Sequence, residues 1–119
     1  MKGNRTDRIN AEIQRVVSNI ISNDLDNPVF EGQFISVAQV DTAPDLSQAK
    51  IYVSILGGAE KKQEVFGALR NCAGFVRREM SAKIELKKTP KIIFVLDETI
   101  DNASRINELL NNIKGAKNE

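Results

Sequence analysis

The sequence predicts a single domain of the α+β class, in which helices pack on one face of a three-stranded mixed sheet. Three observations predict it. The chain has 119 residues, a length that suits one hydrophobic core. Apolar residues recur at helical spacing in three segments, and three short β-prone runs lie between them. The resulting order is α-β-β-α-(kink)-α-β-α, and the helical crossover between the second and third strands would place the helices against one face of the sheet.

The first helix is expected over residues 6–23. Six Ile and Val side chains in this segment follow helical spacing: Ile9, Ile13, Val16, Val17, Ile20 and Ile21. The pair Asn27-Pro28 ends any continuation, because proline pushes the residue before it out of the helical region. Two strands are then expected at 34–40 and 48–56. Residues 42–45 (Thr-Ala-Pro-Asp) lie between them and predict a turn, so the two strands should form a hairpin.

Residues 62–83 predict a long helix that follows Gly57-Gly58. Its apolar stripe recurs at spacings of three and four residues: Val65, Leu69, Ala73, Val76 and Met80. A straight helix over this range would be about 33 Å long, which is long for so small a domain. Glycine inside a helix costs about 1 kcal/mol relative to alanine. We therefore expect the helix to bend at Gly74.

The last part of the chain predicts a strand and a final helix. Residues 92–96 form a continuous apolar run, which is typical of a strand buried on both faces. The triplet Asp97-Glu98-Thr99 supplies capping residues for a helix, whose apolar stripe would be Ile106, Leu109, Leu110 and Ile113. We expect residues 5–113 to form the domain, and residues 1–4 and 114–119 to be flexible termini.

The charge along the chain is uneven. Residues 61–91 carry nine Lys and Arg against three carboxylates, a net charge of +6. Residues 24–60 carry one basic residue against six acidic ones, a net charge of −5, so the overall charge of +1 conceals the contrast. A bent helix followed by a basic loop, with so uneven a field, is what a surface that binds polyanions needs. The segment therefore predicts an RNA-binding module, and the alternative is an ordinary solvated surface.

Several residue types that catalysis and metal binding commonly use are missing or isolated. The chain has no His, which removes His-based acid–base catalysis and most zinc or haem ligation. Cys72 is the only cysteine, so a nucleophilic role lacks a base and a structural thiol is expected. Asp97, Glu98 and Asp101 favour a helix cap over a metal site. We expect a protein that is not an enzyme and has no catalytic residue, cofactor or metal.

The sequence also bears on the cellular compartment. No apolar run approaches the roughly 20 residues that a membrane span needs. The first ten residues lack the apolar stretch of a signal peptide, and a lone cysteine fits a reducing compartment. We therefore expect a cytoplasmic protein that has no membrane partner and is monomeric when free.

Several short strings, in their order and spacing, resemble one known family. The element order is that of type II KH domains, small α+β RNA-binding folds that normally clamp the nucleic-acid backbone with a GxxG loop. No GxxG occurs here, and residues 71–75 (Asn-Cys-Ala-Gly-Phe) take its place inside helical sequence. With this substitution the chain resembles the ribosome-binding factor A family over roughly residues 5–113. The strings that carry the resemblance are 43–47 (APDLS), 49–54 (AKIYVS), 73–79 (AGFVRRE), Pro90 with 93–98 (IFVLDE), 105–106 (RI) and 109–110 (LL).

The resemblance implies a ribosome assembly factor that binds the free small (30S) ribosomal subunit and contacts 16S rRNA. It further implies that the factor promotes late maturation of the subunit, including processing of the 16S rRNA 5′ end region. Such a factor would not be an enzyme, and its role would matter most during growth in the cold. A non-catalytic protein–protein adaptor of the same α+β fold is the alternative, and a small regulatory or catalytic domain of ferredoxin-like shape is another. Adaptor binding should survive ribonuclease, whereas rRNA binding should not.

The candidate RNA-binding residues are the cations of the first helix, the middle helix and the basic loop, with two small residues at the kink: Arg5, Arg8, Arg70, Ala73, Gly74, Arg77, Arg78, Lys83, Lys87, Lys88 and Lys91. Arg70 and Arg77 are seven residues apart and would share a helical face. At Ala73-Gly74 the small side chains would let a phosphate approach the backbone, and the alternative is tight packing of the helix on the sheet. Phe75 could stack on a base, but a place in the core is favoured.

Overall fold

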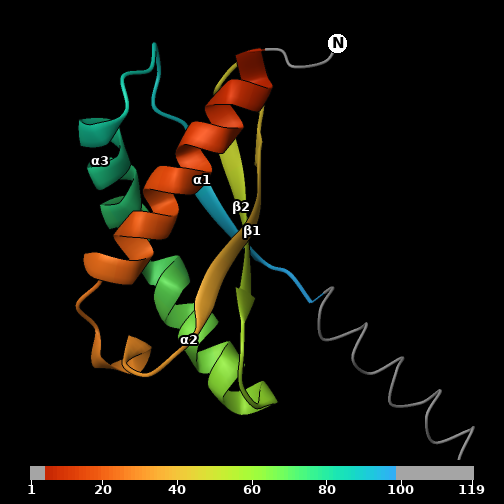
Figure 1. Cartoon of the computed structure of the whole chain (residues 1–119), viewed down its shortest axis with the longest axis vertical. Coiled ribbons are helices and arrows are strands. Elements are labelled where there is room, and N and C mark those ends of the chain that lie inside the picture. Colours follow the sequence, from red (N-terminus) through yellow and green to blue (C-terminus); the bar gives the residue numbers. More distant parts are fainter. Residues whose placement is uncertain (1–4, 99–119) are drawn as a thin grey trace, which may run out of the picture.

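The computed structural model describes residues 5–98 and contains three α-helices and three strands (Figure 1). The predicted order is confirmed as far as the third strand, and the predicted last helix lies outside the described residues. In chain order the elements are α1 (Arg5–Asn23), the short 3-10 helix η1 (Pro28–Phe30), β1 (Ile35–Thr42), β2 (Gln48–Ile55), α2 (Ala59–Asn71), α3 (Ala73–Lys83) and β3 (Lys91–Leu96).

The three strands form one mixed sheet, as predicted, and their order in the sheet is β1-β2-β3. β1 and β2 pair in antiparallel fashion, with Val37 opposite Val53, and β2 and β3 pair in parallel, with Ile51 opposite Phe94. The hairpin register shifts between Val37 and Gln39, which marks a bulge in β1. α2 and α3 supply the crossover that parallel pairing requires.

The α-helices lie on one face of the sheet, and the core fills the space between the two layers (Figure 1). The inward face of α1 is apolar because Ile and Val recur every three or four residues, and Ile13, Val17 and Ile20 are fully buried. Burying one such side chain stabilises the fold by about 1.5–3 kcal/mol. The other helices and the strands complete the core with Val65, Leu69, Val76, Met80, Ala49, Ile51, Val53, Ile55, Ile92 and Phe94.

β3 differs from the prediction of a strand that is buried on both faces. Ile92 and Phe94 are buried under the helices, whereas Ile93 and Val95 are only half-buried. The described helices cover one face of the sheet, so the residues that alternate onto the other face keep contact with solvent. The prediction was wrong because a continuous apolar run does not show how many layers cover the sheet.

The predicted turn between β1 and β2 is confirmed, and two hydrogen bonds hold its shape. The Leu46 N–H donates to the Ala43 carbonyl at 2.8 Å, and the Ser47 N–H donates to the Asp45 carboxylate at 3.0 Å. Hydrogen bonding from Ser47 lowers the pKa of the Asp45 carboxyl below its ordinary value. Leu46 has a φ of 61°, in the left-handed region that residues with a side chain rarely adopt.

The long helix predicted over residues 62–83 is two helices. α2 ends at Asn71, Cys72 leaves the helical conformation with φ −91° and ψ 3°, and α3 begins at Ala73. The bend is therefore at Cys72, and Gly74 lies in the first turn of α3. A Cβ at Gly74 would meet no neighbouring atom within 4 Å. Packing against the sheet thus does not require glycine at this position.

Candidate nucleic-acid interface

α3 and the loop that follows it bring four polar side chains together around an open cavity of about 370 Å³. Arg77, Arg78 and Ser81 come from α3, and Thr89 comes from the loop. Arg77 and Ser81 are four residues apart, so they lie on the same face of the helix. The Thr89 hydroxyl donates to the Ser81 hydroxyl oxygen at 3.3 Å. Among residues 5–98, no carboxylate lines this cavity, which we call the arginine cleft.

Arg77 holds the loop in place while remaining charged. Its Nη2 donates to the Thr89 carbonyl at 2.8 Å, and its Nε donates to the Pro90 carbonyl at 3.2 Å. Both acceptors are neutral, so the guanidinium keeps its positive charge while its position is fixed. Pro90 is itself fully buried and anchors the end of the loop next to β3. The fold therefore presents a preorganised cation at the arginine cleft.

Gly74 extends the face of the arginine cleft toward the start of α3. It lies three residues before Arg77 and four before Arg78, so it is one turn away on the same side of the helix. Gly74 is exposed, and the space that a Cβ would fill is open. The backbone at Gly74 is therefore accessible from outside the helix. Ala73 is instead half-buried and packs on the core.

A second groove, of about 470 Å³, lies between the first turns of α1, the hairpin turn and the loop after α3. It brings together Arg8 and Lys87, which are far apart in the sequence. Glu12 and Glu85 also line this groove, so its charge is mixed. The groove therefore adds two cations near the arginine cleft without forming a purely basic site.

Lys88 and Lys91 lie beside the same hairpin turn. The charge of Lys88 adds to the hydrogen bonds from Ser47 in lowering the pKa of Asp45, which places Lys88 near the turn. Lys91 is exposed at the start of β3, where it pairs in register with Gln48. The basic loop therefore lies against the β1–β2 turn.

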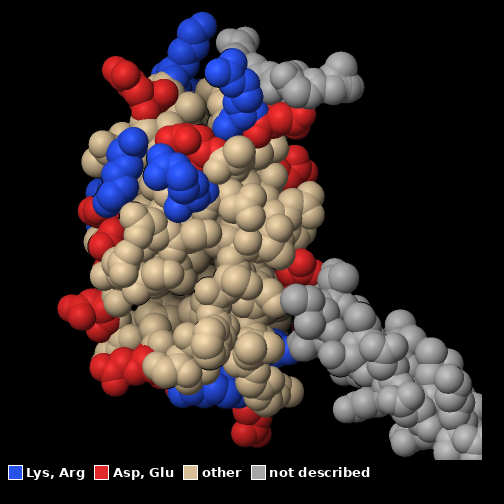
Figure 2. All heavy atoms as spheres, viewed as in Figure 1, with Lys and Arg blue, Asp and Glu red and all other residues tan. Residues whose placement is uncertain are grey.

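Most of these cations gather at one end of the molecule. Figure 2 shows Lys and Arg side chains over the end where α1 begins and where the loop after α3 lies, with carboxylates among them. A broad area of this face below them carries no charged side chain. The uneven charge of the sequence is thus partly preserved as an uneven surface.

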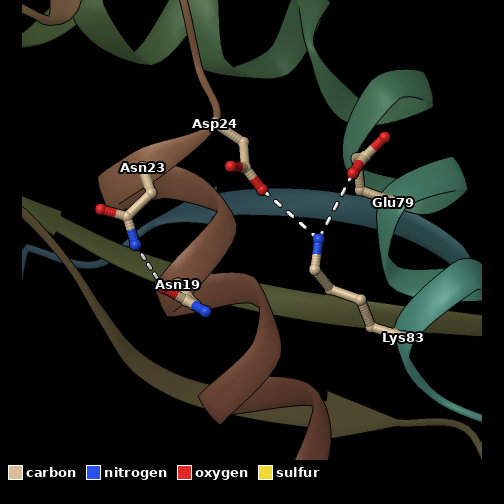
Figure 3. A network of polar contacts seen from close by, with 5 residues as sticks. All are labelled: Asn19, Asn23, Asp24, Glu79 and Lys83. Carbon is tan, nitrogen blue, oxygen red and sulfur yellow. Dashed lines mark hydrogen bonds and ion pairs between the residues drawn. The ribbon is translucent and has the colours of Figure 1, made fainter.

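Lys83, one of the predicted RNA-binding residues, forms ion pairs with two carboxylates. Its Nζ lies 3.5 Å from Asp24, just after α1, and 3.4 Å from Glu79, one turn earlier in α3 (Figure 3). The two carboxylates offset its charge, and the contact with Asp24 joins residues that are 59 positions apart. Nearby, Asn23 donates a hydrogen bond to Asn19 in the last turn of α1. We therefore assign Lys83 to the packing of α1 on α3 and not to the arginine cleft.

The argument that Arg70 and Arg77 share a helical face is wrong. It assumed one continuous helix, and the break at Cys72 places the two residues on separate helices. The Arg70 guanidinium lies over the ring of Phe66, 5.9 Å from its centroid, in a cation–π contact. Arg5 is the first residue of α1, and its side chain is outside the described part of the chain.

Cys72 and Phe75, which lie near the helix break, are both partly buried against the core. Burial raises the pKa of the Cys72 thiol, which disfavours the thiolate that a nucleophile needs. Phe75 is half-buried and packs against the core, the position that the sequence favours. Within residues 5–98, no three His, Cys, Asp or Glu side chains gather as a metal site would need, and no helix is long and apolar enough to cross a membrane.

The sequence prediction missed the two hydroxyl residues of the arginine cleft. Ser81 follows Arg77 by four residues, and this spacing alone could have placed both on one face. Thr89 has no comparable signal, because its position depends on how the loop folds back onto α3. The Arg77 hydrogen bonds to Thr89 and Pro90 fix that fold.

The sequence of the chain is similar to those of known proteins over almost its whole length. The sequence model of the family described as "Ribosome-binding factor A" matches residues 5–110. A Clostridium novyi protein named ribosome-binding factor A is 42% identical over 113 residues, which cover 95% of this chain and 93% of the relative. The match therefore spans all the described elements.

A crystal structure and a fitted homology model have the same fold. The crystal structure of ribosome-binding factor A from Thermus thermophilus aligns with a TM-score of 0.65 and 18% identity, over 76% of this chain and 93% of that chain. A homology model of the Thermus thermophilus factor, fitted into a cryo-electron-microscopy map of a 30S complex, aligns with a TM-score of 0.60 and 18% identity, over 74% of this chain and 90% of that chain. With the sequence match over almost the whole length, these likenesses show that the chain belongs to the ribosome-binding factor A family.

Proposed function

We propose that this protein binds the small ribosomal subunit and contacts 16S rRNA through the arginine cleft and the cations around it. Family membership supports the first part, since the Thermus thermophilus member is fitted into a map of a 30S complex. The observation that carries the second part is the cleft itself, where two guanidinium groups and two hydroxyls line one cavity.

The chemistry of the arginine cleft suits a phosphate group. A guanidinium is planar and always charged, and it can donate two parallel hydrogen bonds to phosphate oxygens. Arg78 makes no hydrogen bond or ion pair with any described residue, so its donors are available. Ser81 and Thr89 add hydroxyl donors at the same cavity. Arg77 would position the loop and add its charge, and Arg78 would make the more direct contact.

The other predicted residues have different places in this proposal. Arg8, Lys87, Lys88 and Lys91 would neutralise neighbouring phosphates and release counterions, which adds affinity with little sequence information. Gly74 would admit a phosphate to the backbone one turn before the arginines. Arg5, Arg70 and Ala73 stay predictions, and Lys83 is left out because two carboxylates engage it.

We further propose that the bound factor favours one arrangement of the rRNA over another, because differential affinity shifts populations. Late maturation of the subunit, including processing of the 16S rRNA 5′ end region, would then proceed from the favoured arrangement. In this proposal the protein is cytoplasmic, non-catalytic and monomeric when free, and its role matters most during growth in the cold. Residues 5–113 would act as one domain. Membership of the ribosome-binding factor A family supports these points.

The test is the binding of the full-length protein to purified free 30S subunits, measured by co-sedimentation. Arg77→Ala combined with Arg78→Ala removes both guanidinium groups, and the affinity should fall by about 10- to 100-fold, or roughly 1.4–2.8 kcal/mol. Arg78→Ala alone keeps the hydrogen bonds that hold the loop and separates contact from loop position. Ribonuclease treatment should release the wild-type protein.

The matched control is Lys61→Ala combined with Lys62→Ala, which removes the same charge from the first turns of α2. Its affinity should change by less than about threefold, since only a screened, long-range attraction is lost. An unchanged affinity for the double arginine variant would show that the arginine cleft is not the footprint. An equal loss in the control would assign the effect to net charge, and binding that survives ribonuclease would favour an adaptor.

A further inference from the structure

The open end of the β1–β2 hairpin, away from its turn, carries exposed apolar side chains. Phe34 and Leu56 are the large hydrophobic residues that the described part of the chain leaves exposed, with 74% and 57% of their surface accessible. The Leu56 N–H donates to the Phe34 carbonyl at 3.1 Å, so the two residues are neighbours at the open end of the hairpin. They also line one hollow of about 160 Å³. Contiguous exposed apolar side chains make this region a candidate surface for interaction.

A groove of about 430 Å³ continues from this pair between the end of α1, η1 and the start of β1. Phe34 and Ile35 line both the groove and the smaller hollow, so the two form one continuous surface. Leu25 and Phe30 add apolar walls that are half-buried against the core. The surface therefore has room for more than a single side chain.

The charged side chains that line this groove, among the described residues, are all acidic. Asp26 and Glu31 line it, and no described Lys or Arg does. Neither carboxylate forms an ion pair with a described residue. Asp24, two residues from Asp26, is by contrast engaged by Lys83. Two uncompensated carboxylates beside exposed apolar side chains favour a partner that is both cationic and apolar.

Other classes of partner fit less well. RNA phosphates would be repelled by Asp26 and Glu31. An anionic lipid surface would be repelled in the same way, although an exposed Phe and Leu would otherwise suit one. A cationic protein segment meets neither objection.

We propose that this surface, which we call the acidic groove, docks a cationic protein segment that carries a large apolar side chain. The apolar side chain packs against Phe34 and Leu56, and flanking Lys or Arg residues meet Asp26 and Glu31. This second site does not depend on the rRNA contact proposed above. Arg8 lines the second groove, at the end of the molecule where the cations gather (the basic end), and Ile21 lines the acidic groove. These two residues are about 20 Å apart along α1, so the acidic groove and the second groove are separate surfaces.

The test uses the full-length protein and three fluorescein-labelled synthetic peptides. The probe has the sequence Lys-Arg-Lys-Phe-Arg-Lys-Arg, the second peptide has Gly in place of Phe, and the third has Glu in place of every cation. Fluorescence anisotropy gives the affinity, and amide shifts in NMR spectra locate the contact. The probe should bind and shift the amides of Phe34 and Leu56. The Gly peptide should bind at least about fivefold more weakly, and the Glu peptide should not bind.

Two variants and a matched control decide where the peptide binds. Glu31→Lys reverses a charge in the acidic groove, and Phe34→Ser removes an exposed ring, so circular dichroism should show both folded. Each should weaken probe binding by at least about fivefold. Glu85→Lys makes the same charge change at the basic end and should alter it by less than about twofold. Glu31→Lys and Phe34→Ser should keep their affinity for protein-free 16S rRNA, so failure of this proposal is distinguishable from failure of the rRNA proposal.

Three outcomes would overturn the acidic groove. No difference between the Phe and Gly peptides would remove the apolar contact. Equal weakening by Glu31→Lys and Glu85→Lys would show general charge attraction. Concentration-dependent sedimentation of the free protein that Phe34→Ser abolishes would show that a second copy occupies the groove instead.

Discussion

The two ends of the molecule use charge in different ways. At the basic end, two neutral carbonyls hold Arg77 and leave its charge uncompensated. At the acidic end, Asp26 and Glu31 remain unpaired with any described residue and lie beside the exposed ring of Phe34. Lys83 lies near the end of α1, and two carboxylates offset its charge. The comparison teaches that the partner of each charge, more than the number of charges, decides which surface can bind.

The largest expected effect comes from reversing one charge at each end. Arg78→Glu should weaken binding to protein-free 16S rRNA by about 10- to 100-fold, because repulsion replaces a phosphate contact. Glu31→Lys should change the same affinity by less than about twofold. Physiological salt screens the interaction between exposed charges over a distance of about 8 Å, and in the proposed complex the RNA lies farther than that from Glu31. Filter binding at one fixed salt concentration measures both. Equal effects would mean that the two ends do not differ in function.

A smaller effect should come from filling the open space at Gly74. Gly74→Ala should raise the free energy of unfolding by about 0.5–1 kcal/mol, because alanine favours the helix and its Cβ meets no neighbouring atom. The same methyl group should lower 30S affinity by about threefold to tenfold, or roughly 0.6–1.4 kcal/mol, if phosphate approaches the backbone there. Thermal unfolding and co-sedimentation provide the two measurements.

Gly67→Ala is the matched control for that substitution. Gly67 is also within a helix, α2, and a Cβ added there would meet no neighbouring atom within 4 Å. It should give a similar gain in stability with no change in 30S affinity. A Gly74→Ala protein that binds as tightly as wild type would remove Gly74 from the interface.

The smallest effect is expected at Lys83. Lys83→Met should lower the free energy of unfolding by less than about 1 kcal/mol, because partly exposed ion pairs contribute little. Its 30S affinity should change by less than about twofold, since the wild-type charge is already offset by Asp24 and Glu79. A tenfold loss of affinity would return Lys83 to the rRNA-binding surface.

The sequence predicts the elements of this fold well where local pattern decides them. The Ile and Val spacing of α1 and the alternation in β2 each reflect one buried face, so their positions could be predicted to within a few residues. Cys72 could not be identified as the break from propensity. Gly74 is the weaker helix former, yet the helix breaks at Cys72, because tertiary packing overrides local propensity.

Which cations belong to the candidate interface could largely be predicted from the sequence, whereas the contacts that each one makes could not. Arg77 and Arg78 stand out as adjacent cations in a basic segment, and the structure brings them to one cleft. The engagement of Lys83 by Asp24 could not be predicted, because the two residues meet only through the packing of α1 on α3. The place of Thr89 likewise depends on a loop that Arg77 holds by its own hydrogen bonds.

The most direct test of the central claim is the salt dependence of binding to free 30S subunits. Each phosphate contact contributes roughly 0.7–0.9 to the slope of log affinity against log salt concentration. The Arg77→Ala, Arg78→Ala double variant should therefore have a slope shallower by about 1.4–1.8 than the wild-type protein. The Lys61→Ala, Lys62→Ala control should keep the wild-type slope. Identical slopes for all three proteins would contradict the claim that the arginine cleft binds rRNA phosphates.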